Sequence, residues 1–192
     1  MSIEIALISV VIVLIILLSP LFSSTVIKAF RGLKTTMKNS SSEEEKISTV
    51  QEIQTAIDTL VSAEKGATIV IDVKNETNEY ITDSELLDSR VSSNLLINIF
   101  EGSKTPLHDG AVIIKGNRID RASAMITNLS KSKSIPKRFG TRHRSALGLA
   151  EVTKAIIIVV SEESGKVRIF NKSKFEEVNA RNLFGRIIDL WV

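Results

Sequence analysis

Three short polar segments of this sequence carry residue types that bind phosphate groups and metal ions. The first, residues 106–111, reads Pro-Leu-His-Asp-Gly-Ala and leads into an apolar run at 111–115. Gly110 would let a ligand approach the backbone closely, and Asp109 could hold a divalent cation or accept a proton from a hydroxyl group. The same spacing also fits an ordinary Asp-Gly turn before a strand, so this segment alone leaves both interpretations open.

The second segment, Gly-Thr-Arg-His-Arg at 140–144, precedes a stretch with helical character. Thr141 suits the N-cap, which would leave free backbone N–H groups pointing outward from the helix start. The side chains that gather there are those of Arg142, His143 and Arg144, with Lys137 and Arg138 just upstream. Cations at a helix N-terminus are unfavourable unless an anion offsets them, and phosphate binds well there. We therefore expect a phosphate site in preference to a solvated cationic turn.

The third segment is Ser-Glu-Glu at 161–163, directly after an apolar run at 155–160. Carboxylates at the end of a buried strand can hold a metal ion or order the two arginines, and a charged turn before Gly165 is the alternative. Together the three segments suit metal-assisted phosphoryl chemistry. The chain contains neither GxxxxGK[ST] nor GxGxxG, which excludes the two common nucleotide-binding motifs.

Strands and helices that alternate along the chain must position these segments. Apolar, β-branched runs predict strands at 67–73, 111–115, 118–127, 155–160 and 167–171, with turns at 75–78 and 116–117. Helical spacing predicts helices at 84–88, 92–100, 142–153 and 176–190. Because the two kinds of element intermingle, we expect an α/β or α+β fold with a mixed central sheet ringed by helices.

A longer amphipathic helix is predicted ahead of this core, at residues 43–64. Ser42 and Glu45 form a capping-box pattern, apolar residues then recur at helical spacing, and Lys65-Gly66 fits a C-terminal stop. Such a helix normally packs one apolar stripe on its own domain. A regulatory or dimer-forming role is the less favoured alternative.

The N-terminal segment has the character of a membrane anchor. Residues 5–27 contain no charged side chain and would reach about 34 Å as a helix at ~1.5 Å per residue, enough for a bilayer core. A cleaved signal peptide is less favoured, because no Lys or Arg precedes the span. Basic residues follow it directly, which places the C-terminal side in the cytoplasm by the positive-inside rule. We expect a single-pass protein of the cell membrane with a cytoplasmic domain.

Composition sets looser bounds on function. The chain has 192 residues, 43% of them hydrophobic and 24% charged, as in an ordinary globular protein. The net charge of +3 fits a phosphate-rich ligand but is too small to require nucleic acid. There are no cysteines, which excludes disulfides and thiolate metal sites.

The three segments together resemble the motifs of the diadenylate cyclase (DAC) domain. The matching motifs are His-Asp-Gly-Ala at 108–111, Thr-Arg-His-Arg at 141–144 and Ser-Glu-Glu at 161–163, in the family's order and spacing. Their surroundings at 86–88, 95–96, 99–100 and 105–107 are also similar. The resemblance covers about residues 66 to 175, and the motifs are specific in combination although each is weak alone.

This resemblance implies a homodimer in which each protomer binds one ATP and the two half-sites face each other. Each ribose 3′-hydroxyl would attack the α-phosphate of the opposite ATP, which yields cyclic di-AMP and pyrophosphate. The residues that it implies for catalysis are Asp109, Arg142, His143 and Arg144. Those that it implies for nucleotide binding are Gly110, Ala111, Met125, Ile126, Thr141, Ser161 and Glu162. A divalent metal, Mn²⁺ or Mg²⁺, would be held by Asp109, His108 and Glu163.

The chain departs from the family pattern in two ways. Where related sequences place an aromatic residue and Leu at the adenine pocket, this chain has Met125 and Ile126, a change that bears on adenine affinity and on selectivity over guanine. The commoner membrane-bound members carry three predicted spans, whereas this chain has room for one. We expect the chain to lack the DNA-reading domain of another DAC class and therefore to have no nucleic-acid partner.

We therefore expect an anchor at 1–27, a basic and Ser-rich linker at 28–42, an amphipathic helix at 43–65 and a diadenylate cyclase domain at 66–192. A membrane-tethered nucleotide sensor or scaffold without catalytic activity is the alternative function. A metal-dependent phosphohydrolase is disfavoured, because such a site needs more than the two histidines present, His108 and His143.

Overall fold

The computed structural model describes residues 42–102, 106–132, 136 and 139–191. Its compact unit begins at Glu45. The first helix, residues 42–62, matches the amphipathic helix predicted at 43–64. The other helical elements are η1 (Thr77–Tyr80), α2 (Ser93–Glu101), η2 (Pro106–His108), α3 (Thr141–Val152) and α4 (Ala180–Trp191). The strands are β1 (Ala67–Ile71), β2 (Ile81–Thr82), β3 (Glu85–Arg90), β4 (Ala111–Lys115), β5 (Arg118–Ile126), β6 (Ile156–Val160), β7 (Val167–Asn171) and β8 (Lys174–Val178).

The strands form one mixed sheet in the order β2-β5-β4-β1-β6-β7-β8, with β3 paired to β5. Only the pair β1 and β4 is parallel in the described part of the sheet, and Ile69 lies opposite Val112 in it. Strands β1 and β6 occupy the centre and are buried along their whole length. Their apolar runs, interrupted only by Thr68 in β1, follow from this position, because both faces of a central strand are covered.

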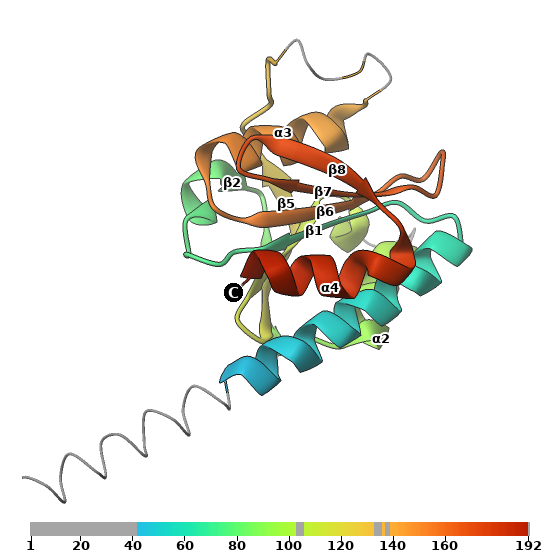
Figure 1. Ribbon diagram of the computed structural model, residues 1–192. Helices are drawn as coiled ribbons and strands as arrows, with labels where there is room; N and C mark the ends of the chain where they lie inside the picture. The colour runs from blue at the N-terminus through green and yellow to red at the C-terminus, as the bar shows by residue number, and fades with distance from the viewer. Residues whose placement is uncertain (1–41, 103–105, 133–135, 137–138, 192) are drawn as a thin grey trace, which may run out of the picture. The chain divides into compact units, whose positions relative to one another are not determined.

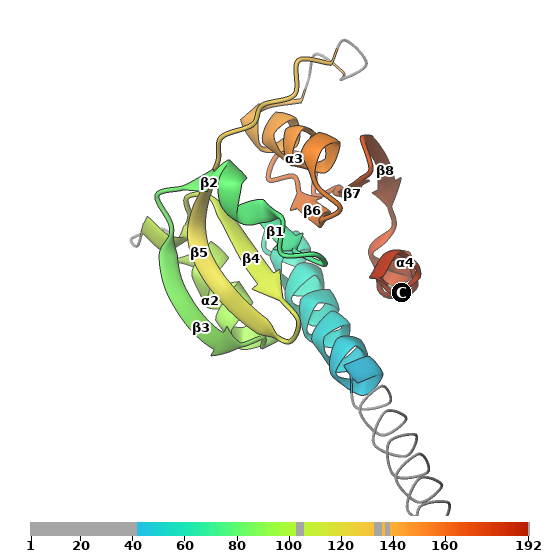
Figure 2. The same ribbon diagram turned by 90° about the vertical axis from the view of Figure 1, so that its left-hand side faces the viewer.

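Helices cover both faces of the sheet (Figures 1 and 2). On one face the first helix, α2 and α4 enclose the larger apolar core, which includes Ile53, Leu96 and Ile187. On the other face α3 packs through Ala146, Leu149 and Ala150. The expected fold, a mixed central sheet ringed by helices, is confirmed.

The helix predicted at 84–88 is wrong, because the chain forms the edge strand β3 there. Glu and Leu favour helices, but pairing with β5 overrides that propensity. The pairing is irregular between Leu86 and Ser89, and Leu86 remains 69% exposed. An irregular, half-exposed edge strand lacks the clean alternation by which strands are identified in a sequence.

The helix predicted at 176–190 begins too early, because β8 occupies the first part of that range and α4 the rest. A two-residue turn joins β7 to β8 and consists of Lys172 and Ser173, with φ of 48° and 63°. Positive φ at both positions is the geometry of a type I′ hairpin turn, which usually contains Asn or Gly. Lys-Ser at such a turn gives no such indication in the sequence.

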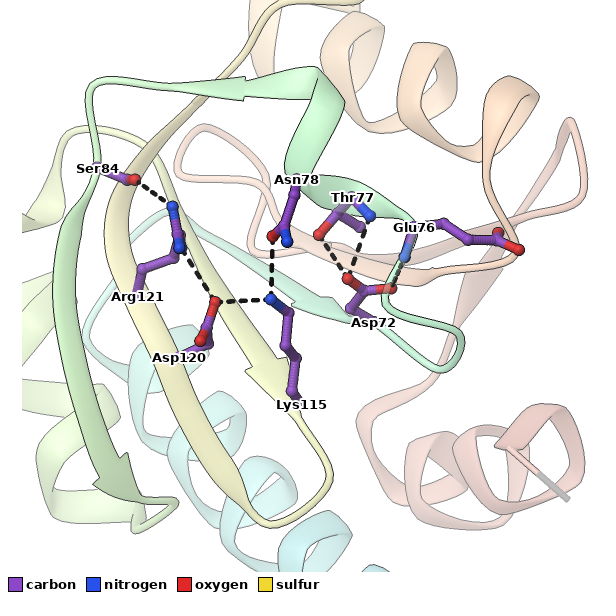
Figure 3. Close-up of polar contacts among 8 residues, drawn as sticks. All are labelled: Asp72, Glu76, Thr77, Asn78, Ser84, Lys115, Asp120 and Arg121. Atoms are coloured by element: carbon purple, nitrogen blue, oxygen red, sulfur yellow. Dashed lines mark hydrogen bonds and ion pairs between the residues drawn. The ribbon is translucent and has the colours of Figure 1, made fainter.

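A polar network holds the sheet at the C-terminal ends of β1 and β4 (Figure 3). The buried carboxylate of Asp72 accepts hydrogen bonds from the backbone N–H groups of Glu76 and Thr77 and from the Thr77 hydroxyl. The Lys115 ammonium lies 2.9 Å from a carboxylate oxygen of Asp120. These contacts anchor η1 and the β4–β5 hairpin, so the opposite ends of β1 and β4 are free to carry a ligand site.

The predicted membrane span at 5–27 and the linker after it lie outside the described residues. Within the described part of the chain, no helix combines the length and the apolar character needed to cross a bilayer.

Candidate functional site

A cavity of about 860 Å³ opens at the N-terminal ends of β1 and β4, beside the C-terminal end of β6 and the N-terminal end of α3. Eleven of the predicted site residues line it: Asp109, Gly110, Ala111, Met125, Ile126, Thr141, Arg142, His143, Ser161, Glu162 and Glu163. The described residues His108 and Arg144 are not part of its walls, and Lys137 and Arg138 lie outside the described residues. The fold thus brings the three sequence segments to one cavity.

The loop that carries Asp109 is fastened to β5 by its backbone. Gly110 has a φ of +135°, and a Cβ placed there would lie 2.6 Å from the carbonyl carbon of Ser123. The Ser123 hydroxyl donates to the carbonyl oxygens of Pro106 at 2.9 Å and Asp109 at 3.0 Å. Glycine is required because the loop approaches β5 backbone to backbone, and this contact fixes where Asp109 stands.

The start of α3 differs from the prediction at one residue. Gly140, not Thr141, is the N-cap, and no side chain caps the helix within the described structure. Because a glycine offers no capping oxygen, the first backbone N–H groups of α3 remain open to an anion. The guanidinium of Arg142, in the first turn of α3, forms an ion pair with Glu162, with Nη1 3.2 Å from Oε2. This ion pair agrees with the predicted ordering of an arginine by the acidic segment.

His143 is an uncharged member of the site at neutral pH. Burial, together with the nearby charges of Arg168 and Arg142, lowers the pKa of its imidazole from 6.5 to about 4. The ring stacks on Phe139 with centroids 4.4 Å apart. The positive charge of this part of the cavity therefore comes from arginine, and His143 can contribute only a neutral hydrogen bond.

The sequence interpretation missed Arg168, which also lines the cavity. Its side chain is only 5% exposed, although it lies on the apolar strand β7. The guanidinium is bonded to Glu177 at 3.0 Å and lies over the Phe139 ring, 4.9 Å from the centroid. The one indication in the sequence was a lone arginine within a run of Val, Ile and Phe, since a buried charge needs dedicated partners.

Thr68 is a second residue that was missed. It lines the cavity from β1 and is 3% exposed, and its hydroxyl has no hydrogen-bond partner among the described residues. A threonine inside an apolar strand run was the available indication, but the strand pattern does not say which face it occupies.

The described residues contain no group of three or more His, Asp or Glu side chains arranged around a metal position. Of the three predicted ligands, Asp109 and Glu163 both line the cavity and His108 does not. Mg²⁺ typically takes one or two protein carboxylates and completes its shell with water and substrate phosphates. Asp109 and Glu163 could therefore serve as the two protein carboxylates of such an ion.

Comparison with known proteins places this site in context. Residues 54–175 match the family model described as DAC, the nucleotide-binding domain of the DisA bacterial checkpoint controller. The chain is 45% identical over 127 residues to cyclic di-AMP synthase CdaA of Bacillus subtilis, a match that covers 66% of this chain and 46% of that protein. It is 40% identical over 154 residues to a diadenylate cyclase of Listeria monocytogenes, covering 80% of this chain and 56% of that protein. The chain thus spans about half the length of these curated relatives.

Solved structures agree with the sequence comparison. A crystal structure of a double mutant of DacA from Staphylococcus aureus superposes with a TM-score of 0.71 at 34% identity, over 78% of this chain and 97% of that one. A hypothetical membrane spanning protein from Bacillus cereus gives a TM-score of 0.64 at 36% identity, over 67% of this chain and 62% of that one.

Proposed function

We propose, from the premise that this chain belongs to the DAC domain family, that it joins two ATP molecules into cyclic di-AMP and releases two pyrophosphates. The observation that carries the proposal is the meeting of three motifs in one cavity, those at 109–111, 141–143 and 161–163. They come from separate elements, and packing the core alone gives no reason for them to converge. The curated relatives named as cyclic di-AMP synthase or diadenylate cyclase support the same activity.

The groups that would bind the triphosphate lie at and near the start of α3. The open N–H groups there and the Arg142 guanidinium are donors suited to phosphate oxygens, and Ser161 adds a hydroxyl. Arg144 is not part of the cavity walls of this chain and would be a second cation near the helix start. These groups offset the negative charge of the nucleotide, without which two ATP molecules would repel each other strongly.

The base fits the other end of the cavity. Met125 is 51% exposed and lines the cavity with Ile126, so both offer apolar surface to adenine. Met is adaptable in shape and makes favourable contacts with ring systems. Asp109 lies on the intervening loop, where its carboxylate can accept the proton of a ribose 3′-hydroxyl.

The reaction divides equally between two facing protomers. The 3′-oxygen of one ATP bonds to the α-phosphorus of the other, the bond from that phosphorus to the bridging oxygen of the pyrophosphate breaks, and the hydroxyl proton passes to a carboxylate. A second, equivalent attack closes the ring. Alignment of the hydroxyl, phosphorus and leaving group is the main requirement. One chain offers only half of this arrangement, so we infer that a homodimer is the active unit.

A divalent cation fits the site, with Asp109 and Glu163 as its protein ligands and with ATP oxygens completing its shell. Mn²⁺ or Mg²⁺ suits such oxygen donors, and when bound it would neutralise phosphate charge and polarise the α-phosphate. His108, which is not part of the cavity walls, would be a further ligand.

The sequence of the N-terminal segment supports a location at the membrane. Residues 1–27 would anchor the chain in the cell membrane and the linker 28–42 would place the domain in the cytoplasm. Residues 43–65 would join the linker to the domain at 66–192. This arrangement would keep the cyclase beside the membrane.

The test is incubation of the full-length chain, in detergent, with ATP and Mn²⁺, followed by chromatography of the products. We expect cyclic di-AMP and pyrophosphate, with specific activity that rises with protein concentration as dimers form. Formation of ADP or AMP would instead indicate a phosphohydrolase, and unchanged ATP that is nevertheless bound would indicate a sensor.

A further inference from the structure

The hydroxyl of Thr68 is buried without a hydrogen-bond partner among the described residues. Thr68 lies on β1 and is 3% exposed. Nearly all buried polar groups in proteins are hydrogen-bonded, because an unpaired one costs free energy. The other buried threonines follow this rule: the hydroxyls of Thr49, Thr77 and Thr153 donate to Glu45, Asp72 and Leu149. The Thr68 hydroxyl therefore needs a hydrogen-bond partner that is not part of the described chain.

The position of Thr68 points to that partner. Thr68 lies opposite Val159 of β6, and on its other side β4 runs parallel in the register that pairs Ile69 with Val112. Ala111, the residue before Val112, lies opposite Ala124 of β5. Thr68, Ala111 and Ala124 all line the cavity, so three small side chains from neighbouring strands form part of its wall. Among these three, only Thr68 carries a side-chain hydrogen-bonding group.

The order of the strands indicates which part of a nucleotide Thr68 would meet. Ser161 follows β6 on one side of β1, where the proposed phosphate groups lie. Met125 lies on β5, two strands away on the other side, where the base is proposed. β1 is adjacent to β6, but the wall that Thr68 shares with Ala111 and Ala124 extends from β1 towards β5, the side on which the base is proposed. We propose that the Thr68 hydroxyl is a further ligand contact, which hydrogen-bonds the nucleoside half of ATP and not its triphosphate.

This inference rests on the proposed function and makes a prediction with two readouts. Thr68→Val keeps the shape of the side chain and removes only the unpaired hydroxyl. Removal of a buried, unsatisfied group leaves the ligand-free fold as stable or makes it more stable. The same change removes a bond to the ligand, so nucleotide affinity should fall by about tenfold, or ~1.4 kcal/mol.

The experiment measures binding of the full-length chain to α,β-methylene-ATP, which cannot release pyrophosphate, and to inorganic tripolyphosphate. We expect Thr68→Val to weaken the first and leave the second unchanged, with the melting temperature of the ligand-free protein equal or higher. The matched control is Thr153→Val, whose hydroxyl bonds to Leu149 and Ala155 away from the cavity. It should lower the melting temperature and leave both affinities unchanged.

The 2′-deoxy and 3′-deoxy forms of the nucleotide identify the atom contacted. If one of them binds equally well to the wild type and to Thr68→Val, the contact is that ribose hydroxyl. If both lose affinity as the parent nucleotide does, the contact is to the base. An unchanged affinity for α,β-methylene-ATP, or an equal loss for tripolyphosphate, overturns the inference. A wild-type chain that binds no nucleotide overturns the proposed function instead.

Discussion

Arg168 of β7 donates a hydrogen bond from Nη1 to Nε2 of His143 on α3, across 3.1 Å. Because a guanidinium can only donate, Nε2 must be the accepting nitrogen, and the ring proton must sit on Nδ1. A protonated imidazole would carry hydrogens on both nitrogens and face Arg168 with like charge. The pair therefore keeps His143 neutral and in one tautomer, with one N–H left to donate.

This relationship predicts that the protein loses stability as the pH falls from about 6.5 to 4. The unfolded chain protonates His143 at its ordinary pKa of 6.5, whereas the folded chain does so only near its lowered pKa of about 4. Between those values the unfolded state binds more protons, so the free energy of unfolding falls with falling pH. We expect the loss between pH 7 and pH 5 to be larger in the wild type than in His143→Gln by about 1–2 kcal/mol.

Urea denaturation of the two proteins at both pH values measures this difference. The chain has only two histidines, and His108 is present in both proteins, so its contribution cancels. Parallel pH dependences for wild type and His143→Gln would show that His143 titrates alike in the folded and unfolded states. Arg168→Met provides a second check, because removal of a neighbouring positive charge should raise the pKa of His143 towards its ordinary value.

The cavity walls were predictable from the sequence to the extent that they directly precede or follow strongly patterned strands. The aliphatic runs that form β4 and β6 are recognisable as strands in the sequence. Asp109 lies shortly before β4, and Ser161 directly follows β6. A polar residue just before or just after a buried central strand must lie where that strand ends, on the border of the sheet that the strand ends form. The structure brings both Asp109 and Ser161 to one cavity, and their roles there remain predictions.

Arg168 was not predictable because its surroundings depend on a hairpin that the sequence conceals. Its partner Glu177 lies opposite it only because β7 and β8 pair through the Lys172-Ser173 turn. When 176–190 is interpreted as a helix, Glu177 lies on the wrong element and the buried guanidinium has no partner. Thr68 presents a similar difficulty, because a strand buried on both faces gives no pattern from which its facing side can be inferred.

A second prediction concerns Gly66, which leaves room for the Arg142 guanidinium. A Cβ at residue 66 would lie 2.3 Å from Nη1 of Arg142 and 3.2 Å from Cβ of Glu162. The arginine end is flexible and can move, so Gly66→Ala should displace it and break its ion pair. The pair is exposed, with 39% and 62% of the two side chains accessible, so stability should change by less than about 1 kcal/mol.

Product formation by Gly66→Ala should fall about tenfold, because the main cation at the start of α3 no longer holds its position. Chromatographic assay of cyclic di-AMP and a thermal melt of each protein test the two halves of this prediction. Gly185→Ala is the control, since an added Cβ meets nothing within 4 Å there and residue 185 lies on α4, away from the cavity. It should keep full activity. Normal turnover by Gly66→Ala would mean that the position of Arg142 is not important.

A third prediction compares two glycines with positive φ. An alanine Cβ at Gly110 would meet the backbone of Ser123 and Ala124 at 2.6–2.9 Å, whereas at Gly116 it would meet nothing within 4 Å. Gly116→Ala should therefore cost only the conformational strain, about 1 kcal/mol. Gly110→Ala adds a clash with backbone that cannot move aside, so we expect a loss of roughly 2–4 kcal/mol together with loss of product. Equal costs in urea denaturation would contradict the close contact between this loop and β5.

A fourth prediction concerns Asp109→Asn. The amide cannot take up the proton of a 3′-hydroxyl and carries no charge for a metal ion, so turnover should fall at least ~100-fold. Nucleotide binding should remain measurable, because Arg142 and the N–H groups of α3 are unchanged. The control is Asp88→Asn on the edge strand β3, where the side chain is 71% accessible and its carboxylate pairs with Arg118 of β5. It should cyclise ATP normally.

Mixing Asp109→Asn with the wild-type chain tests the division of labour between protomers. In a mixed dimer only one of the two ATP molecules has a carboxylate beside its 3′-hydroxyl, so one attack proceeds and the ring stays open. We expect the linear dinucleotide to accumulate in the mixture, in proportion to the share of mixed dimers, and to be absent when either protein is incubated alone. Cyclic product above the amount that the wild-type dimers in the mixture can make, without the linear form, would mean that one Asp109 serves both attacks, contrary to two equivalent half-sites.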